Sequence, residues 1–190
     1  MPIRRGGGRP FISPMGEPFR PASHDESGLA EWFNQADVNH DGRLTIEEMQ
    51  ADADRFFATL DTNHDGEIDP DEIDFYETRV VPEIRGGGGY FDARDNDRHQ
   101  GAARFGLLDL PEPVTAADSN FNRGVSREEF RQAATQRFLA LDLDHHGYLT
   151  LAGLQAIRPA PPAWPNPKVT PGQAPVNDED DYSSVRQPHP

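Results

Sequence analysis

The sequence predicts an all-α fold, a bundle of helix–loop–helix units with short strand pairing between loops and with disordered termini. Three observations predict it. An acidic pattern of twelve residues occurs four times, and glycine and proline gather outside the four copies. Apolar residues next to the copies follow the period of a helix. The 190 residues, 35% of them hydrophobic, fit one modest domain or two small ones that share a core.

Composition divides the chain into five segments. Two stretches have the apolar content of a packed domain, and the other three are rich in glycine, proline or charge. The predicted segments are a disordered arm (1–23), loops 1 and 2 with their helices (24–81), a Gly/Pro-rich linker (82–113), loops 3 and 4 with their helices (114–157) and a disordered, proline-rich acidic tail (158–190). Residues 105–110 form an apolar patch of the linker that we expect to dock on the core.

Apolar spacing predicts helices beside the loops. Three faces are Leu29, Trp32, Phe33 and Ala36; Met49, Ala53, Phe56, Phe57 and Leu60; and Phe130, Ala134, Phe138 and Leu141. The second and third faces each belong to one helix that links two loops. Pro82 ends the helix after loop 2, and Pro111 and Pro113 leave space only for a turn from about Thr115 before loop 3.

The repeats are loop 1 (37–48), loop 2 (61–72), loop 3 (118–129) and loop 4 (142–153). A calcium ion takes oxygen ligands from loop positions 1, 3 and 5, a backbone carbonyl at 7, often water at 9, and a bidentate acid at 12. Loop 1 supplies Asp37, Asn39, Asp41, the carbonyl of Arg43, and Glu48. Loop 2 supplies Asp61, Asn63, Asp65, the carbonyl of Glu67, Asp69 and Glu72. Both patterns are complete, with glycine at the sharp turn of position 6.

The other two loops depart from this pattern. Loop 3 has Asp118, Asn120, Asn122, the carbonyl of Gly124, and Glu129. Its turn residue is Arg123, where positive φ costs about 1 kcal/mol, so we expect weaker binding there. Loop 4 keeps a weak set of Asp142, Asp144 and His146 but has Gly153 at position 12, which predicts a structural partner for another loop. Alternatively, these three residues hold a transition metal such as zinc.

These motifs resemble the EF-hand superfamily over residues 37–157, and apolar residues at position 8 of all four loops agree with it. Asp37 and Asp61 are 24 positions apart, as are Asp118 and Asp142. The helix between two such loops separates them by about 18 Å. We therefore expect loop 1 to pair with loop 4 and loop 2 with loop 3, across antiparallel linking helices; pairing of loop 1 with loop 3 is the alternative. The short spacing is similar to that of bacterial EF-hand proteins such as lanmodulin, which binds lanthanides.

Charge and composition narrow the function. A net charge of −15 disfavours nucleic acid and anionic membranes as partners. The absence of cysteine excludes disulfides and thiolate chemistry, and no catalytic motif or membrane span is present, so we expect a protein that is not an enzyme. The basic start lacks the apolar stretch of a signal peptide; the resemblance leaves a bacterial periplasmic, secreted or cytoplasmic protein open. We expect calcium ions as ligands of a buffer or calcium-stabilised interaction module, with a lanthanide-binding protein or a calcium-dependent sensor or adaptor as alternatives.

Overall fold

The computed structural model describes residues 10–22, 27–85 and 100–157, which are mostly helical with short strands. The α-helices are α1 (Gly28–Ala36), α2 (Ile46–Leu60), α3 (Pro70–Phe75), α4 (Arg127–Leu141) and α5 (Leu151–Ile157). A π-helix, η1 (Tyr76–Val80), extends α3, and the 3-10 helices are η2 (Pro82–Ile84), η3 (Gly101–Arg104) and η4 (Thr115–Ala117). The strands are β1 (Phe11–Ile12), β2 (Pro18–Phe19), β3 (Leu44–Thr45), β4 (Glu67–Ile68), β5 (Val125–Ser126) and β6 (Tyr148–Leu149).

Helices α2, α3 and α4 begin with the same reciprocal cap. In each, the side chain before the helix accepts the backbone N–H of the third helical residue, and a glutamate at that third position accepts the N–H of the capping residue. The pairs are Thr45 with Glu48, Asp69 with Glu72, and Ser126 with Glu129. A cap of this kind contributes about 1 kcal/mol. It also fixes each glutamate at the end of its loop.

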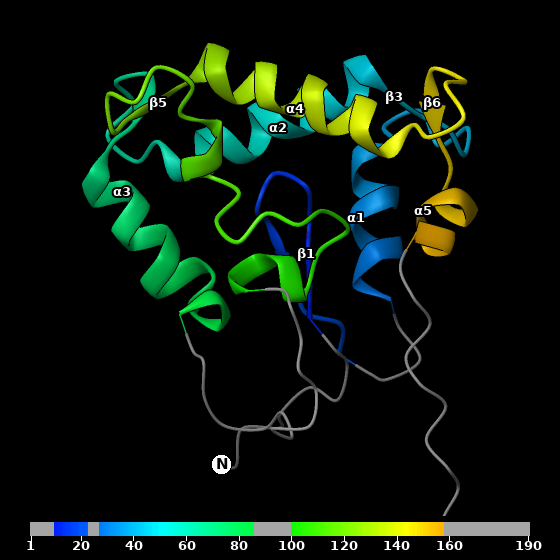
Figure 1. Cartoon of the computed structure of the whole chain (residues 1–190), viewed down its shortest axis with the longest axis horizontal. Coiled ribbons are helices and arrows are strands. Elements are labelled where there is room, and N and C mark those ends of the chain that lie inside the picture. Colours follow the sequence, from blue (N-terminus) through cyan, green and yellow to red (C-terminus); the bar gives the residue numbers. More distant parts are fainter. Residues whose placement is uncertain (1–9, 23–26, 86–99, 158–190) are drawn as a thin grey trace, which may run out of the picture. The chain divides into compact units, whose positions relative to one another are not determined.

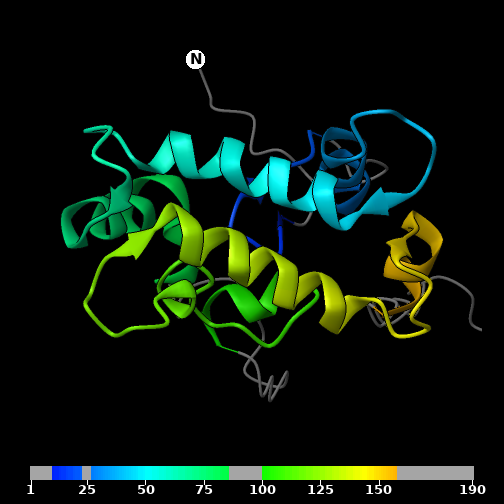
Figure 2. The ribbon, with the colours of Figure 1, turned by 90° about the horizontal axis from the view of Figure 1, so that it is seen from above.

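The loops pair across the two halves of the chain. Strand β3 of loop 1 pairs with β6 of loop 4, and β4 of loop 2 pairs with β5 of loop 3, all antiparallel. The residues at position 8 are Cα partners in these pairs and are buried: Leu44 with Leu149, and Ile68 with Val125. Helices α2 and α4 therefore lie antiparallel, side by side (Figure 2). The predicted pairing is confirmed, and the alternative of loop 1 with loop 3 is wrong.

The apolar faces predicted for the helices meet in one core. All residues named for α1, α2 and α4 from their spacing are buried, with exposures between 0% and 4%. The incoming turn of loop 3 is η4, beginning at Thr115 as expected. Helices α1 and α5 lie at one end of the α2–α4 pair and α3 at the other (Figure 1). One core thus supports all four loops.

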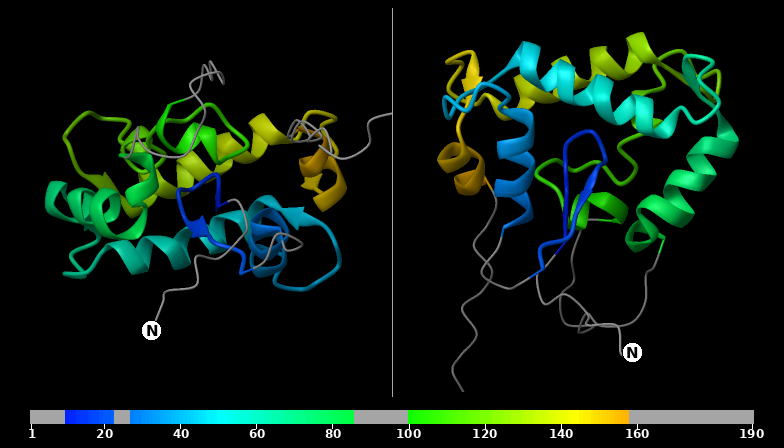
Figure 3. Two further views of the ribbon diagram at one scale, coloured as in Figure 1. Left: turned by 90° about the horizontal axis from the view of Figure 1, so that it is seen from below. Right: turned by 180° about the vertical axis from the view of Figure 1, so that it is seen from behind.

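Residues 10–22, expected to belong to a disordered arm, instead form an ordered hairpin. Strand β1 pairs antiparallel with β2, and Phe11 and Ile12 are 0% and 1% exposed. The ring of Phe11 lies 5.9 Å from that of Trp32 in α1. The hairpin lies between α1 and α3, beneath the α2–α4 pair (Figure 3). The prediction was wrong here because these strands are too short to show a periodic pattern and depend on tertiary contacts for stability.

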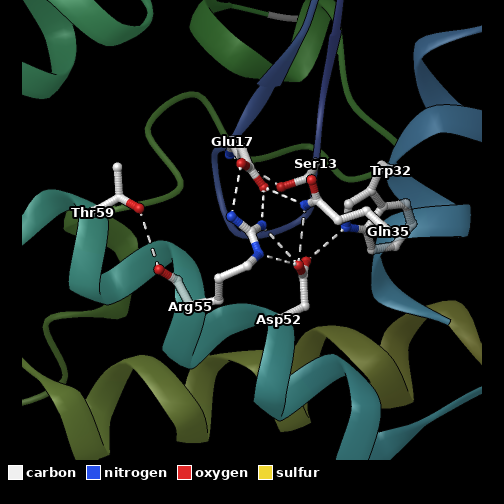
Figure 4. A network of polar contacts seen from close by, with 7 residues as sticks. All are labelled: Ser13, Glu17, Trp32, Gln35, Asp52, Arg55 and Thr59. Atoms are coloured by element: carbon white, nitrogen blue, oxygen red, sulfur yellow. Dashed lines mark hydrogen bonds and ion pairs between the residues drawn. The ribbon is translucent and has the colours of Figure 1, made fainter. Parts of the chain in front are cut away.

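A polar network ties the hairpin to α1 and α2 (Figure 4). Asp52 of α2 is 7% exposed and accepts hydrogen bonds from Trp32 Nε1 at 3.0 Å, Gln35 Nε2 at 3.2 Å and Arg55 Nη2 at 2.8 Å. Arg55 also pairs with Glu17, which lies between β1 and β2. Because a buried charge is tolerated only when it is paired and hydrogen-bonded, this network favours a single position for the hairpin.

The second half of the predicted linker also packs on the core. Phe105 is 4% exposed, and its carbonyl accepts the backbone N–H of Ile12 at 3.2 Å. The buried guanidinium of Arg137 donates to the carbonyls of Pro14 and Pro113 at 2.8 and 2.7 Å. The docking expected for residues 105–110 is therefore confirmed at Phe105, and residues 100–113 are structured, contrary to the linker prediction.

The expectations for residues 1–9, 86–99 and the tail from 158 onward lie outside the described residues. Within the described ranges, no helix has the length and apolar character needed to cross a membrane.

Candidate metal centre

The first aspartate of each complete loop is buried and held by the loop backbone. Asp37 is 3% exposed and accepts the N–H groups of positions 5 and 6 at 3.2 and 2.9 Å. Asp61, 7% exposed, repeats the arrangement, with both distances 3.1 Å. These bonds wrap the backbone around the carboxylate. Each oxygen has a second lone pair, which leaves acceptor capacity for a cation.

The side chains at positions 3 and 5 are fixed in the same way in both loops. Asn39 accepts the N–H of position 5 at 2.8 Å, and Asp41 accepts that of position 7 at 2.8 Å. In loop 2 the corresponding distances are 2.9 Å for Asn63 and 3.0 Å for Asp65. Such short-range bonds to the following backbone fold an Asx residue into a tight turn. The predicted ligands at positions 1, 3 and 5 are thus brought onto one turn in each loop.

The glutamate at position 12 closes each loop back on its start. In loop 2, Glu72 Oε1 accepts the N–H groups of Thr62 and Asn63 at 2.7 and 3.2 Å. In loop 1 the closure is looser: Glu48 Oε1 accepts the N–H of Asn39 at 3.5 Å. Loop 2 is therefore the more tightly closed of the two. Its position 9 residue, Asp69, uses Oδ1 to cap α3.

All four loops turn through left-handed backbone. Position 4 has φ between 55° and 60° in every loop, and the residues are His40, His64, Phe121 and His145. The three histidines are exposed, as expected of side chains that point away from the loop interior. At position 6 of loop 3, Arg123 has a φ of 77°, which confirms the predicted strain.

Loop 3 has one carboxylate oxygen with no protein partner. Asp118 Oδ2 accepts the N–H of Arg123 at 3.0 Å, whereas Oδ1 is buried and accepts no hydrogen bond. In Asp37 and Asp61 both oxygens are hydrogen-bonded. A buried, unpartnered oxygen is costly. A bound cation would satisfy this one.

The glutamate of loop 3 is held by side chains as well as by backbone. Its Oε1 accepts from the Ser119 hydroxyl at 2.9 Å and from Asn120 Nδ2 at 2.7 Å, and its Oε2 accepts from the Ser126 hydroxyl at 2.7 Å. Burial alone would raise the pKa of Glu129, but the hydrogen bonds from Ser126 and Ser119 outweigh burial and lower this pKa to about 2. Glu129 is therefore a carboxylate at neutral pH.

Loop 4 is folded like the others but lacks the closing acid. Asp142 accepts the N–H groups of His146 and Gly147 at 3.1 and 2.9 Å. Asp144 Oδ2 lies 2.9 Å from His146 Nδ1, while Gly153 presents no side chain at position 12. Among the described residues, no three acidic or histidine side chains converge as a metal-binding cluster. The zinc alternative for loop 4 therefore gains no support.

Comparison with known families agrees with this geometry. The model of the EF hand family matches residues 29–51 and 53–74, which hold loops 1 and 2 with their flanking helices. Residues 29–74 therefore match two successive EF hands with closely spaced loops. EF hands are in general calcium-binding motifs. No curated protein and no solved structure matches the chain.

The donor set of these EF hands fits a hard cation. Carboxylate, amide and carbonyl oxygens are the ligands that calcium prefers. The chain has no cysteine, and no histidines converge in the part of the chain that the structure describes. The acids of loops 1 and 2 do not converge as a cluster in the described residues; in an EF hand, amide and backbone carbonyl oxygens complete the ligand set. The buried Oδ1 of Asp118, which accepts no hydrogen bond, is one further oxygen that could bind a hard cation.

Sequence reasoning missed the side chains that hold the closing glutamates. Thr45 and Ser126 donate hydroxyl hydrogen bonds to Glu48 and Glu129, and the T-x-x-E and S-x-x-E patterns that predict such caps are visible in the chain. The hydroxyls at position 2 are different. Those of Thr62 and Ser119 bond across the loop, each at 2.9 Å, and no local pattern predicts them.

Proposed function

We propose that the protein binds calcium through two strong loops, 1 and 2, and one weaker loop, 3, while loop 4 is their structural partner. Bound ions would cancel the repulsion among clustered acids and stabilise the helix arrangement, which makes the protein a calcium buffer or a calcium-stabilised interaction module. The proposed ligands are those predicted at positions 1, 3, 5, 7 and 12 of loops 1 to 3.

The closure of loop 2 is the observation that carries the proposal. Glu72 comes from the first turn of α3 and bonds to backbone N–H groups at the start of its own loop. The acid of position 12 is therefore tied to the two residues that follow Asp61 at the start of the loop. Asp61, Asp65 and Glu72 thus belong to one closed loop, and a divalent cation bound there would relieve the repulsion among their carboxylates.

The loops rank by charge and strain. Loop 2 has an additional acid at position 9, loop 1 has three charged ligands, and loop 3 has two with a strained turn residue at Arg123. We expect loop 2 to bind at least as tightly as loop 1, and loop 3 to bind least tightly of the three. Loop 4 lacks the bidentate acid, so only high calcium would occupy it.

Calorimetric titration of the calcium-free protein with calcium chloride tests the proposal. The double variant Glu48→Gln, Glu72→Gln keeps both caps, since glutamine also serves in them, but removes two bidentate carboxylates. We expect the tight sites of loops 1 and 2 to disappear, together with most of the rise in Tm that calcium produces.

The matched control is Glu47→Gln with Asp71→Asn, two exposed acids that each precede a closing glutamate and lie outside the proposed ligand set. It removes the same charge, so its calcium binding should stay close to that of the parent. Equal losses in both double variants would show a nonspecific effect of charge. Fewer than two ions bound by the parent in the millimolar range would refute the proposal.

A further inference from the structure

In both loop pairs, one side chain from position 7 contacts the paired loop. In the pair of loops 2 and 3, Glu67 of β4 reaches over to loop 3. Its Oε1 accepts a long hydrogen bond of 3.4 Å from Asn122 Nδ2, at position 5 of loop 3. Glu67 therefore lies in one loop along the backbone and contacts a proposed ligand of another with its side chain.

Gly124, at position 7 of loop 3, leaves room for this crossing. A Cβ added there would collide with the carboxylate and the Cγ of Glu67. The φ of Gly124 is not in the left-handed region, so the backbone does not require glycine at this position. The absent side chain matters because the glutamate of the paired loop occupies its space.

The contact also orients the Asn122 amide. Asn122 Nδ2 faces Glu67, while its Oδ1 accepts the N–H of Gly124 at 2.9 Å. Because only the amide nitrogen can donate to a carboxylate, Glu67 holds the oxygen on the side of the loop turn. Asn122 is the residue that replaces the aspartate found at position 5 of loops 1 and 2.

Loop 3 lacks charge where Glu67 supplies it. Its own ligand set contains only two acids, Asp118 and Glu129, and Arg123 adds a positive charge at position 6. One oxygen of Asp118 is buried without a partner. With Glu67 from loop 2, loop 3 would have three nearby acids, as many as loop 1.

The other pair of loops carries the opposite charge at this place. Arg43, position 7 of loop 1, lies with its Cζ 4.7 Å from the ring centre of Tyr148, position 7 of loop 4. Loop 4, which lacks an acid at position 12, thus contacts a cation from its partner. Loop 3, which has Glu129 at position 12, contacts an anion instead.

We propose that Glu67 is a positioning residue of loop 3, whose carboxylate orients Asn122 and supplies the third negative charge of that calcium site. The proposal rests on the calcium binding proposed above. It couples loops 2 and 3, since the backbone carbonyl of Glu67 belongs to the first site and its carboxylate to the second.

The test is a calcium chloride titration of the full chain followed by NMR, with backbone amide signals giving a midpoint for each loop. Glu67→Gln removes the charge and keeps the backbone. Gly124→Ala keeps the charge but displaces the carboxylate from loop 3. Loss of one unit charge near a divalent ion is worth on the order of tenfold in affinity. We expect a shift of that order at loop 3 in both variants, larger than any shift at loop 2, with loop 1 unchanged.

Arg43→Gln is the matched control at position 7 of loop 1, and it should leave the midpoint of loop 3 unchanged. A loop 3 midpoint unaffected by Glu67→Gln would overturn the inference, and so would equal shifts in loops 1, 2 and 3. If loop 3 takes up no calcium while loops 1 and 2 do, the inference fails and the binding proposed for loops 1 and 2 stands. If loops 1 and 2 take up none, the proposed function itself fails.

Discussion

Gly153→Glu should give loop 4 the two features that it lacks, a capping glutamate in the first turn of α5 and an acid at position 12. Gly153 is the third residue of α5, where α2, α3 and α4 have a capping glutamate. A Cβ there would lie 3.2 Å from Thr150 Oγ1, a close contact with the side chain that would take part in the cap. Replacing glycine inside a helix contributes about 0.5–1 kcal/mol. Thr150 Oγ1 already accepts the N–H of Gly153 at 3.1 Å, so the glutamate completes the cap with one further hydrogen bond, which contributes about 0.5–1 kcal/mol. The variant should therefore be about 1–2 kcal/mol more stable than the parent without calcium.

Urea unfolding in chelator and in calcium separates the contributions. Gly153→Ala is the control, because it gains helix propensity but no carboxylate. In chelator the glutamate variant should exceed the alanine variant by the value of the cap, and in calcium the difference should grow as loop 4 takes up an ion. If the two variants were equally stable in chelator, the cap argument would be wrong. A difference that does not grow in calcium would show that the missing acid is not what limits loop 4.

Two further predictions concern the core and its pH dependence. Asp52→Ala leaves the buried indole N–H of Trp32 unsatisfied, which should lower the free energy of unfolding in urea by about 1–3 kcal/mol. Asp54→Ala is the control, because it removes only surface ion pairs on the same helix and should cost under about 1 kcal/mol. Similar losses in the two variants would contradict the role given to the network. Burial and the nearby charge of Glu77 raise the pKa of Glu112 to about 7. A raised pKa means that protonated Glu112 stabilises the fold: this stabilisation is complete below the pKa of the unfolded state and is lost as pH rises through 7. Glu112→Gln should therefore match the stability of the parent near pH 4.5 and be more stable than the parent at pH 8, by on the order of 1–2 kcal/mol after solvent screening. An equal stability difference at both pH values would refute this.

The repeat allowed much of this fold to be predicted from the sequence. A helix between loops 24 residues apart cannot bend back, so sequence neighbours had to find partners in the other half, as β3 with β6 and β4 with β5 show. The apolar residues at position 8 face inward because a strand alternates its side chains. Both inferences depend on local geometry, which a single sequence contains.

Features that depend on distant contacts could not be predicted. Asp52 lies near an apolar helix face, and its main partner, Trp32, belongs to another helix. The strands around Phe11 are two residues long, too short for a periodic signal. The carboxylate of Glu67 meets Asn122, 55 positions away, so position 7 could be interpreted only as a backbone carbonyl.

The crossed pairing of the strands makes the halves depend on each other. A fragment ending at residue 85 would keep loops 1 and 2 but expose both β3 and β4 as open edges, and a fragment starting at residue 100 would do the same with β5 and β6. Neither fragment could complete a pair by itself. Mixed together, the two have complementary edges and complementary faces of α2 and α4, so this architecture is suited to fragment complementation rather than to a dumbbell of separable lobes.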